Sequence, residues 1–313
     1  MGRKVLATPR SFGTGSQGAA DLLARRGFDL RLNPYGRILT KAEMIREIRD
    51  AEAVIVGVDP LDREVLSQAE RLKLISKYGV GTDNIDAAYA AQRGIRITTT
   101  VGANTEAVAD YAFTLMLAAA RRVIPIDRAC RRGDWNKTLT VDVHGSTLGL
   151  IGLGHIGKAV ARRAKGFDMK ILAYDHLRDE DFAVRHGITY VDTLQTLIEQ
   201  ADFVSLHLPL NEHTRHLIGP REFETMKETA VLINTARGGL IDETAMLEAL
   251  KAGRIWGAGL DVFEREPPDL EDLHTLDNLV IGSHCAASTR HAVENMGMMA
   301  VRNVIQHLCG EEG

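Results

Sequence analysis

A glycine-rich turn near the middle of the chain places the strongest constraint on the fold. The apolar run Leu148–Ile151 leads into Gly152-Leu153-Gly154-His155-Ile156-Gly157, a Gly-x-Gly-x-x-Gly turn, and a helical pattern follows it. In such a turn Gly152 allows the chain to reverse tightly, Gly154 lets the backbone approach a pyrophosphate, and Gly157 lets the helix pack closely on the strand. The N–H groups that begin the helix favour phosphate. A turn that merely needs glycines is the alternative, and the strand and helix around the motif argue against it.

An acidic residue follows the next predicted strand, where a ribose ligand is expected. The strand is Lys170–Tyr174, and Asp175 ends it. A carboxylate accepts hydrogen bonds from both ribose hydroxyls of NAD and repels the additional phosphate of NADP. Arg178 lies three residues further on and could offset that repulsion. We expect NAD as the cofactor.

Short apolar runs alternate with amphipathic stretches along most of the chain. Expected strands are Val5–Ala7, Ala53–Val56, Leu74–Ser76, Ile95–Thr98, Leu148–Ile151, Lys170–Tyr174, Phe203–Leu206, Ala230–Asn234, Ile255–Asp261 and Leu279–Ile281. Expected helices are Ala19–Arg26, Lys41–Asp50, Asp62–Ala69, Ile85–Arg93, Ile156–Lys165, Thr193–Gln200, Glu222–Met226 and Asp242–Lys251. This alternation predicts parallel sheets with helices on both faces.

The length and two long helical segments indicate how the domains are arranged. A chain of 313 residues exceeds the usual size of a single core. The segments run from about Asn104 to Arg122 and from about Ser288 to Leu308, and either could carry the chain between domains. We predict an α/β protein with two doubly wound parallel-sheet domains. Residues 1–100 and 287–313 form a flavodoxin-like substrate domain, and a Rossmann-type NAD-binding domain, residues 101–286, is inserted into it.

Three polar side chains follow three successive predicted strands of the second series. They are Arg237, Glu266 and His284. The carboxyl ends of parallel strands share one edge, where ligands gather. A guanidinium there binds a carboxylate and polarises a neighbouring keto oxygen. An imidazole oriented by a carboxylate can move a hydroxyl proton. Taken singly, Arg237 would fit a surface salt bridge and His284 a structural histidine; their joint placement predicts hydride transfer to or from C2 of a small 2-hydroxy acid.

The order of these motifs resembles that of the D-isomer-specific 2-hydroxyacid dehydrogenase family, in particular its phosphoglycerate dehydrogenase-like branch. The resemblance runs from about Val54 to Arg302. Besides the glycine turn and His284, the matching runs are Lys77–Asp86, Gly102–Asp110, His207-Leu208-Pro209, Asn234–Asp242 and Asp261–Pro267.

The resemblance implies roles for individual residues. Arg237, Glu266 and His284 match the family's catalytic residues. Substrate contacts are expected from the backbone N–H groups of Val80 and Gly81, from Asn104 and from Arg237. Cofactor contacts are expected, besides the three glycines, from His155, Ile156, Asp175, His207, Thr235, Ala236 and Asp261, with Asp261 near the nicotinamide amide. The resemblance also implies a cleft that closes on binding and a homodimer formed through the cofactor domain.

Two segments depart from the family pattern. Cys285-Ala286-Ala287 replaces an apolar residue and two glycines, so two additional methyl groups could narrow the site near the nicotinamide. Relatives that oxidise phosphoglycerate use arginines near the third strand of the first domain, where this chain has Val56-Gly57-Val58-Asp59-Pro60. Asp59 would repel a phosphate, unless Arg10 or Arg37 cancels its charge, and these groups could equally be simply solvated. We expect a small unphosphorylated acid, such as glyoxylate or hydroxypyruvate.

Composition narrows the partners and the location. The formal net charge of -4 gives no basic field for nucleic acid, and the apolar runs are too short to span a bilayer. The spacing of Cys130, Cys285 and Cys309 suits neither a disulfide framework nor a zinc site. No secretory signal pattern begins the chain. We expect a cytoplasmic protein with a small-molecule substrate, no metal, and no nucleic-acid or membrane partner.

Other functions remain open on the sequence alone. An NAD(H)-sensing, co-repressor-like binding protein of the same fold would keep the same arginine, glutamate and histidine. The chain could also be a phosphoglycerate dehydrogenase proper, or could oxidise a small anion such as phosphite or formate. Turnover of 2-keto acids with NADH favours the enzyme, whereas tight NADH binding without turnover favours the sensor.

Overall fold

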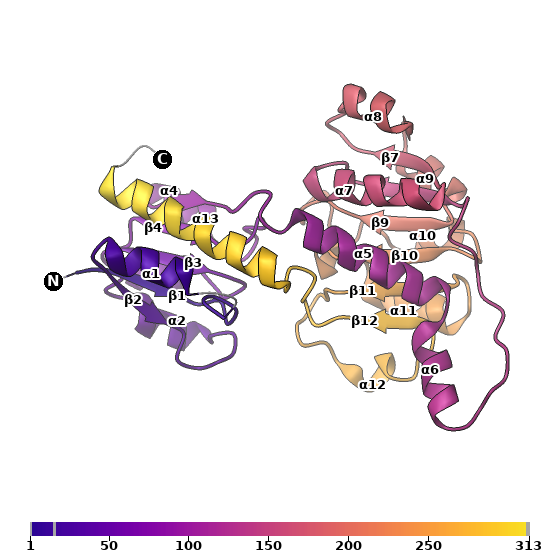
Figure 1. The fold of residues 1–313 in the computed structure, drawn as a ribbon, viewed down its shortest axis with the longest axis horizontal. Helices are drawn as coiled ribbons and strands as arrows, with labels where there is room; N and C mark the ends of the chain where they lie inside the picture. Colours follow the sequence, from indigo (N-terminus) through magenta and orange to yellow (C-terminus); the bar gives the residue numbers. More distant parts are fainter. Residues whose placement is uncertain (1, 15–16, 311–313) are drawn as a thin grey trace. The chain divides into compact units, whose positions relative to one another are not determined.

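A computed structural model describes residues 2–14 and 17–310 (Figure 1). The chain divides into two compact units, Met1–Asn104 with Ala287–Gly313, and Thr105–Ala286. The predicted domain ranges also include residues 1, 15–16 and 311–313, which lie outside the described residues. In the described part of the chain, no helix is both long enough and apolar enough to cross a membrane.

The first unit is built on a parallel sheet of five strands within the described residues, in the order β2-β1-β3-β4-β5. The strands are β1 (Arg3–Ala7), β2 (Phe28–Leu32), β3 (Ala53–Val56), β4 (Leu74–Lys77) and β5 (Arg96–Thr98). The helices are α1 (Gly18–Arg25), α2 (Lys41–Ile48), α3 (Arg63–Gln68), α4 (Ala87–Gln92) and α13 (Arg290–Cys309). This strand order is the flavodoxin-like one, as predicted.

The second unit contains a parallel sheet of seven strands, counted over the described residues, in the order β12-β11-β10-β9-β6-β7-β8. The strands are β6 (Thr147–Ile151), β7 (Lys170–Tyr174), β8 (Ile188–Tyr190), β9 (Phe203–Leu206), β10 (Val231–Asn234), β11 (Gly257–Leu260) and β12 (Leu279–Ile281). Taken from β6, this is the Rossmann order with one strand added at the β12 edge.

The helices of the second unit cover both faces of its sheet, as Figure 1 shows. They are α5 (Thr105–Ala120), α6 (Val123–Arg131), α7 (His155–Ala164), η1 (Lys165–Phe167), α8 (Glu180–His186), α9 (Leu194–Gln200), α10 (Pro220–Thr225), η2 (Gly238–Leu240), α11 (Glu243–Lys251) and α12 (Leu270–Leu273). The sequence pattern does not predict α6. Arg122 separates it from α5 with a φ of +50°, in the left-handed region, so the chain turns there.

Both sheets reverse their strand order at one point, between β1 and β3 in the first unit and between β6 and β9 in the second. Ligands of doubly wound proteins bind outside the carboxyl ends of the strands at such points. In the second unit the glycine turn follows β6 and His207 follows β9. The fold therefore brings two of the predicted cofactor segments to the place where a ligand is expected.

Candidate active site

The glycine turn has the geometry of a phosphate-binding loop. Gly152 has a φ of +93°, and a Cβ on it would lie 2.4 Å from the carbonyl oxygen of His207. A Cβ on Gly157 would lie 2.2 Å from the carbonyl oxygen of Gly152. Gly154 precedes α7 and has open space around its Cα, with no heavy atom of the described chain within 4 Å of a built Cβ. The turn thus needs glycine at its first and third positions and leaves the beginning of α7 open, which fits a pyrophosphate.

Asp175 lies beside the glycine turn. One of its carboxylate oxygens accepts a hydrogen bond from the N–H of Leu153 at 2.7 Å, and the other accepts one from the N–H of Leu177 at 2.9 Å. Arg178 is paired with Asp192, with 2.8 Å between Nη2 and Oδ1. The guanidinium that could have favoured a 2′-phosphate is therefore engaged by a carboxylate of its own.

Two further predicted cofactor residues occupy the ends of β9 and β10. His207 Nε2 lies 2.8 Å from the hydroxyl oxygen of Ser205. Burial lowers the pKa of His207 to about 4, so its ring is neutral near pH 7. Thr235 has a buried hydroxyl oxygen without a hydrogen-bond partner among the described residues. A buried polar atom of this kind calls for a ligand or water, and here it suits a bound dinucleotide.

The imidazole of His284 and the carboxylate of Glu266 form a direct pair. His284 Nδ1 lies 2.7 Å from Glu266 Oε2, and Glu266 Oε1 accepts a hydrogen bond from the N–H of Phe263 at 3.2 Å. His284 follows β12 with a φ of +55°, and its N–H donates to the carbonyl of Asp261 at 2.8 Å. A left-handed histidine is uncommon and often marks a functional position.

The charge on Glu266 reflects its partners. Burial alone would raise its pKa. The hydrogen bond from His284, the charge of His284, the N–H of Phe263 and the charge of Arg237 outweigh burial, so the pKa of Glu266 lies below its ordinary value. Glu266 therefore interacts with both His284 and Arg237 within the second unit.

The loop that carries Arg237 is fixed by a buried amide. Asn234 donates from Nδ2 to the carbonyl of Arg237 at 2.8 Å and accepts from the N–H of Ala236 at 2.9 Å. A Cβ on Gly238 would lie 1.9 Å from the carbonyl carbon of Phe263, so the backbones after β10 and β11 touch. Sequence reasoning did not single out Asn234 or Gly238, although both lie inside a run that it recognised.

Asp261 organises the segment around His284. Its side chain is buried, and its two oxygens accept hydrogen bonds from the N–H groups of Cys285 at 2.9 Å and Ala286 at 2.7 Å. Burial raises the pKa of Asp261 although these N–H groups oppose the shift. Cys285 Sγ lies 3.3 Å from the hydroxyl of Tyr111. Asp261 thus holds the backbone that follows His284, and the Cys285 thiol adds a side-chain contact with Tyr111.

The predicted substrate residues of the first unit lie on the carboxyl side of its sheet. Val80 and Gly81 follow β4, and the loop that contains them is closed at its base by Lys77, whose Nζ lies 2.7 Å from Asn84 Oδ1. Asn104 has a side-chain oxygen that is buried without a hydrogen-bond partner in the described chain. An unsatisfied amide oxygen suits a residue that contacts a ligand.

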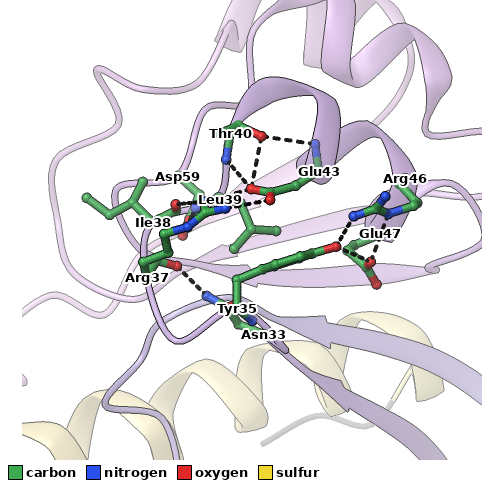
Figure 2. Close-up of polar contacts among 10 residues, drawn as sticks. All are labelled: Asn33, Tyr35, Arg37, Ile38, Leu39, Thr40, Glu43, Arg46, Glu47 and Asp59. Atoms are coloured by element: carbon green, nitrogen blue, oxygen red, sulfur yellow. Dashed lines mark hydrogen bonds and ion pairs between the residues drawn. The ribbon is translucent and has the colours of Figure 1, made fainter.

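Asp59 has a structural role (Figure 2). It is 2% exposed, and its side chain accepts a hydrogen bond from the N–H of Leu39 at 2.8 Å, which Figure 2 shows. The hydroxyl of Thr8 donates a second hydrogen bond to it. Arg37 is bound by both oxygens of Glu43, at 2.8 and 2.6 Å. The interpretation of Asp59 as a simply solvated group is wrong, whereas Arg37 is an exposed residue paired with Glu43. Asp59 joins the loops after β1, β2 and β3 at the point where this sheet reverses its order.

Comparisons with known proteins match both the second unit and the whole chain. The family described as D-isomer specific 2-hydroxyacid dehydrogenase, NAD binding domain, matches residues 113–286. A glyoxylate reductase of Korarchaeum cryptofilum is 46% identical over 280 residues, which cover 87% of this chain and 84% of that protein. A D-3-phosphoglycerate dehydrogenase of Methanocaldococcus jannaschii is 42% identical over 276 residues, covering 87% of this chain and 53% of that protein. The crystal structure of an Aquifex aeolicus D-lactate dehydrogenase, complexed with NAD and lactic acid, has a TM-score of 0.84 at 31% identity and covers 98% of this chain and 96% of that one.

Proposed function

The chain belongs to the D-isomer specific 2-hydroxyacid dehydrogenase family, and from this premise we propose that its substrate is a small, unphosphorylated 2-keto acid, reduced with NADH. The activity itself, NAD-dependent oxidation and reduction at C2 of a D-2-hydroxy acid, follows from the family and its named members. The observation that carries the catalytic assignment is the contact of 2.7 Å between His284 Nδ1 and Glu266 Oε2.

We propose that His284 is the general acid of the reduction. Because Nδ1 is engaged by Glu266, Nε2 is the ring nitrogen left to give a proton to the keto oxygen. Glu266 fixes the ring orientation and stabilises the imidazolium, and its lowered pKa keeps it ionised. Arg237 binds the substrate carboxylate and polarises the keto group. In the reverse direction His284 takes the hydroxyl proton.

The bound cofactor supplies the hydride at its nicotinamide ring. Residues proposed to hold it are Gly152, Gly154, His155, Ile156, Gly157, Asp175, His207, Thr235, Ala236 and Asp261. We propose that Val80, Gly81 and Asn104 add substrate contacts, the first two through backbone N–H groups.

The first unit supports an unphosphorylated substrate. Arg37 is bound to Glu43, and Asp59 is buried and bonded to backbone and hydroxyl groups. Val58 and Val80, which follow β3 and β4, are 42% and 44% exposed. The ends of β3 and β4 thus present apolar side chains, which suits a short uncharged substituent at C2.

A comparison of substrates tests the proposal. We expect NADH-dependent turnover of glyoxylate and hydroxypyruvate with a higher kcat/KM than 3-phosphohydroxypyruvate, measured at low and high salt. A preference for the phosphorylated acid that fades with salt would identify a phosphate site and a phosphoglycerate dehydrogenase proper. Tight NADH binding without turnover of any 2-keto acid would favour the sensor.

We further propose a cytoplasmic homodimer formed through the second unit. Large apolar side chains are exposed on and after α6 there, among them Trp135 at 83% and Leu139 at 93%. Exposed apolar groups of this size commonly mark an interface. Light scattering should give twice the chain mass for the wild type, and Trp135→Glu with Leu139→Glu should give a monomer; a monomeric wild type would contradict the proposal.

A further inference from the structure

A second group of titratable side chains adjoins the His284–Glu266 pair and has no part in the mechanism above. It consists of Glu243, Glu264 and His216, which we call the carboxylate clasp. Glu243 begins α11, Glu264 lies two residues before Glu266, and His216 lies in the loop after β9. The three residues come from three separate connections of the second unit.

Reciprocal contacts between side chains and backbone join the members of the clasp. The carboxylate of Glu243 accepts a hydrogen bond from the N–H of Glu264. In return, Glu264 Oε1 accepts from the N–H of Glu243 at 3.5 Å and lies 3.0 Å from His216 Nε2. The clasp therefore ties the segment that carries Glu266 to the first turn of a helix.

The anchoring side of the clasp is itself well fixed. The N–H of His216 donates to the carbonyl of Gly239 at 2.8 Å, and the N–H of Asp242 donates to the carbonyl of Ile218 at 2.9 Å. Asp242 also caps α11 by accepting from the N–H of Ala245 at 3.0 Å. By contrast, residues 264–267 are exposed and belong to no helix or strand. Residues 264–267 have little packing of their own to hold them, so the hydrogen bonds of the clasp fix their position.

The carboxylate of Glu243 in the clasp lies in an environment that disfavours its charged form. Burial raises the pKa of Glu243, and the negative charges of Glu264 and Glu266 raise it further. The N–H of Glu264 and the charge of His216 act against this shift. Such a concentration of carboxylates is unfavourable for stability and is typical of functional sites.

We propose that Glu243, acting with Glu264 and His216, is a positioning residue that holds residues 263–266 so that the Glu266 carboxylate reaches His284 Nδ1. This inference rests on the proposed function, because its effect is transmitted through the Glu266–His284 pair. The feature that matters is the acceptor oxygen at position 243, not its charge, since that oxygen receives the N–H of Glu264.

Three variants of α11 test the proposal. Glu243→Ala removes the acceptor, Glu243→Gln keeps an amide oxygen in its place, and Glu248→Ala removes an exposed carboxylate of the same helix. We expect Glu243→Ala to lower kcat for glyoxylate about tenfold, since a displacement of about 1 Å can cost about 100-fold in rate. The Kd for NADH should not change. Glu243→Gln and Glu248→Ala should keep wild-type kcat.

Two results would overturn the clasp: a wild-type kcat in Glu243→Ala, or a loss in Glu243→Gln as large as that in Glu243→Ala. If Glu243→Ala does not fold, Glu264→Ala removes the carboxylate that accepts from the N–H of Glu243 and contacts His216, and Glu264→Gln keeps an amide oxygen there; a wild-type kcat in Glu264→Ala would then overturn the clasp. Glu266→Ala, measured beside them, separates a failure of the proposed role of Glu266 from a failure of the clasp. If Glu266→Ala keeps its activity, the proposed role of Glu266 fails; if it loses activity while Glu243→Ala does not, only the clasp fails; if the wild type reduces no 2-keto acid, the proposed function itself fails.

Discussion

Asp175 and Arg178 determine the charge near the expected position of the adenosine ribose. Arg178 is neutralised by Asp192, so the carboxylate of Asp175 dominates. We predict that Asp175→Ala lowers the ratio of kcat/KM for NADH over NADPH by about tenfold or more, because hydrogen bonds to a charged group are worth about 1.5–3 kcal/mol. Adding Asp192→Ala should lower the ratio further by releasing Arg178. A wild type that prefers NADPH, or an unchanged ratio in Asp175→Ala, would remove this role from Asp175.

The lowered pKa of His207 determines how this residue makes the free energy of unfolding depend on pH. Burial lowers that pKa from 6.5 to about 4, so between these values the folded protein binds fewer protons than the unfolded chain. The free energy of unfolding should therefore fall as the pH falls from about 6.5 to about 4, and the contribution of this histidine should be constant above that window. Urea unfolding of the wild type and of His207→Gln at pH 7, 5.5 and 4 measures the difference. Curves that remain parallel would contradict the buried, neutral ring.

The connections after β10 and β11 contact each other backbone against backbone. A Cβ on Gly238 would lie 1.9 Å from the carbonyl carbon of Phe263, so Gly238→Ala must displace a backbone that leads to Arg237 on one side or Glu266 on the other. We predict a loss of about 1–3 kcal/mol in the free energy of unfolding, as for overpacked cores, together with a fall in kcat. Gly166→Ala is the matched control, because a Cβ there meets no heavy atom of the described chain within 4 Å. If the two variants have equal free energies of unfolding and equal kcat, the two backbones can move apart without cost, and the prediction is contradicted.

Central strands and their ends could be predicted because their physics is local. The runs at β3, β7 and β9 match their predicted bounds, since strands inside a parallel sheet read as short apolar runs, and the edge strand β12 matches as well because its three residues are all apolar. The patterns did not predict β2 and β8, which are edge strands with exposed positions. A strand of that kind differs little from a loop in composition.

Contacts between distant residues could not be predicted in the same way. Nothing in the sequence near Asp59 shows that its carboxylate meets the N–H of Leu39, twenty residues away. The link between Glu243 and Glu264 spans 21 residues and joins two elements whose approach depends on the packed sheet. The contact between Glu266 and His284 was predictable because both residues follow strands of one parallel sheet, whose carboxyl ends share an edge.

Both units of the molecule have the same kind of architecture. Each unit has a parallel sheet whose strand order reverses once, and predicted ligand residues lie at the carboxyl ends in both. In the second unit these ends carry the glycine turn, the orphaned hydroxyl of Thr235 and the Glu266–His284 pair. We therefore propose that the second unit binds the cofactor and carries out proton transfer, and that the first unit contributes part of substrate recognition.

We propose above all that His284 moves the proton while the cofactor binds independently of it. The direct measurement is kcat for glyoxylate reduction at pH 7 by the wild type and by His284→Ala, with the Kd for NADH determined on the same samples by fluorescence. We predict that kcat falls by roughly 100- to 10,000-fold, the usual contribution of a general acid, while the Kd for NADH is unchanged. A His284→Ala variant that turns over glyoxylate at the wild-type rate would show that His284 is not the general acid.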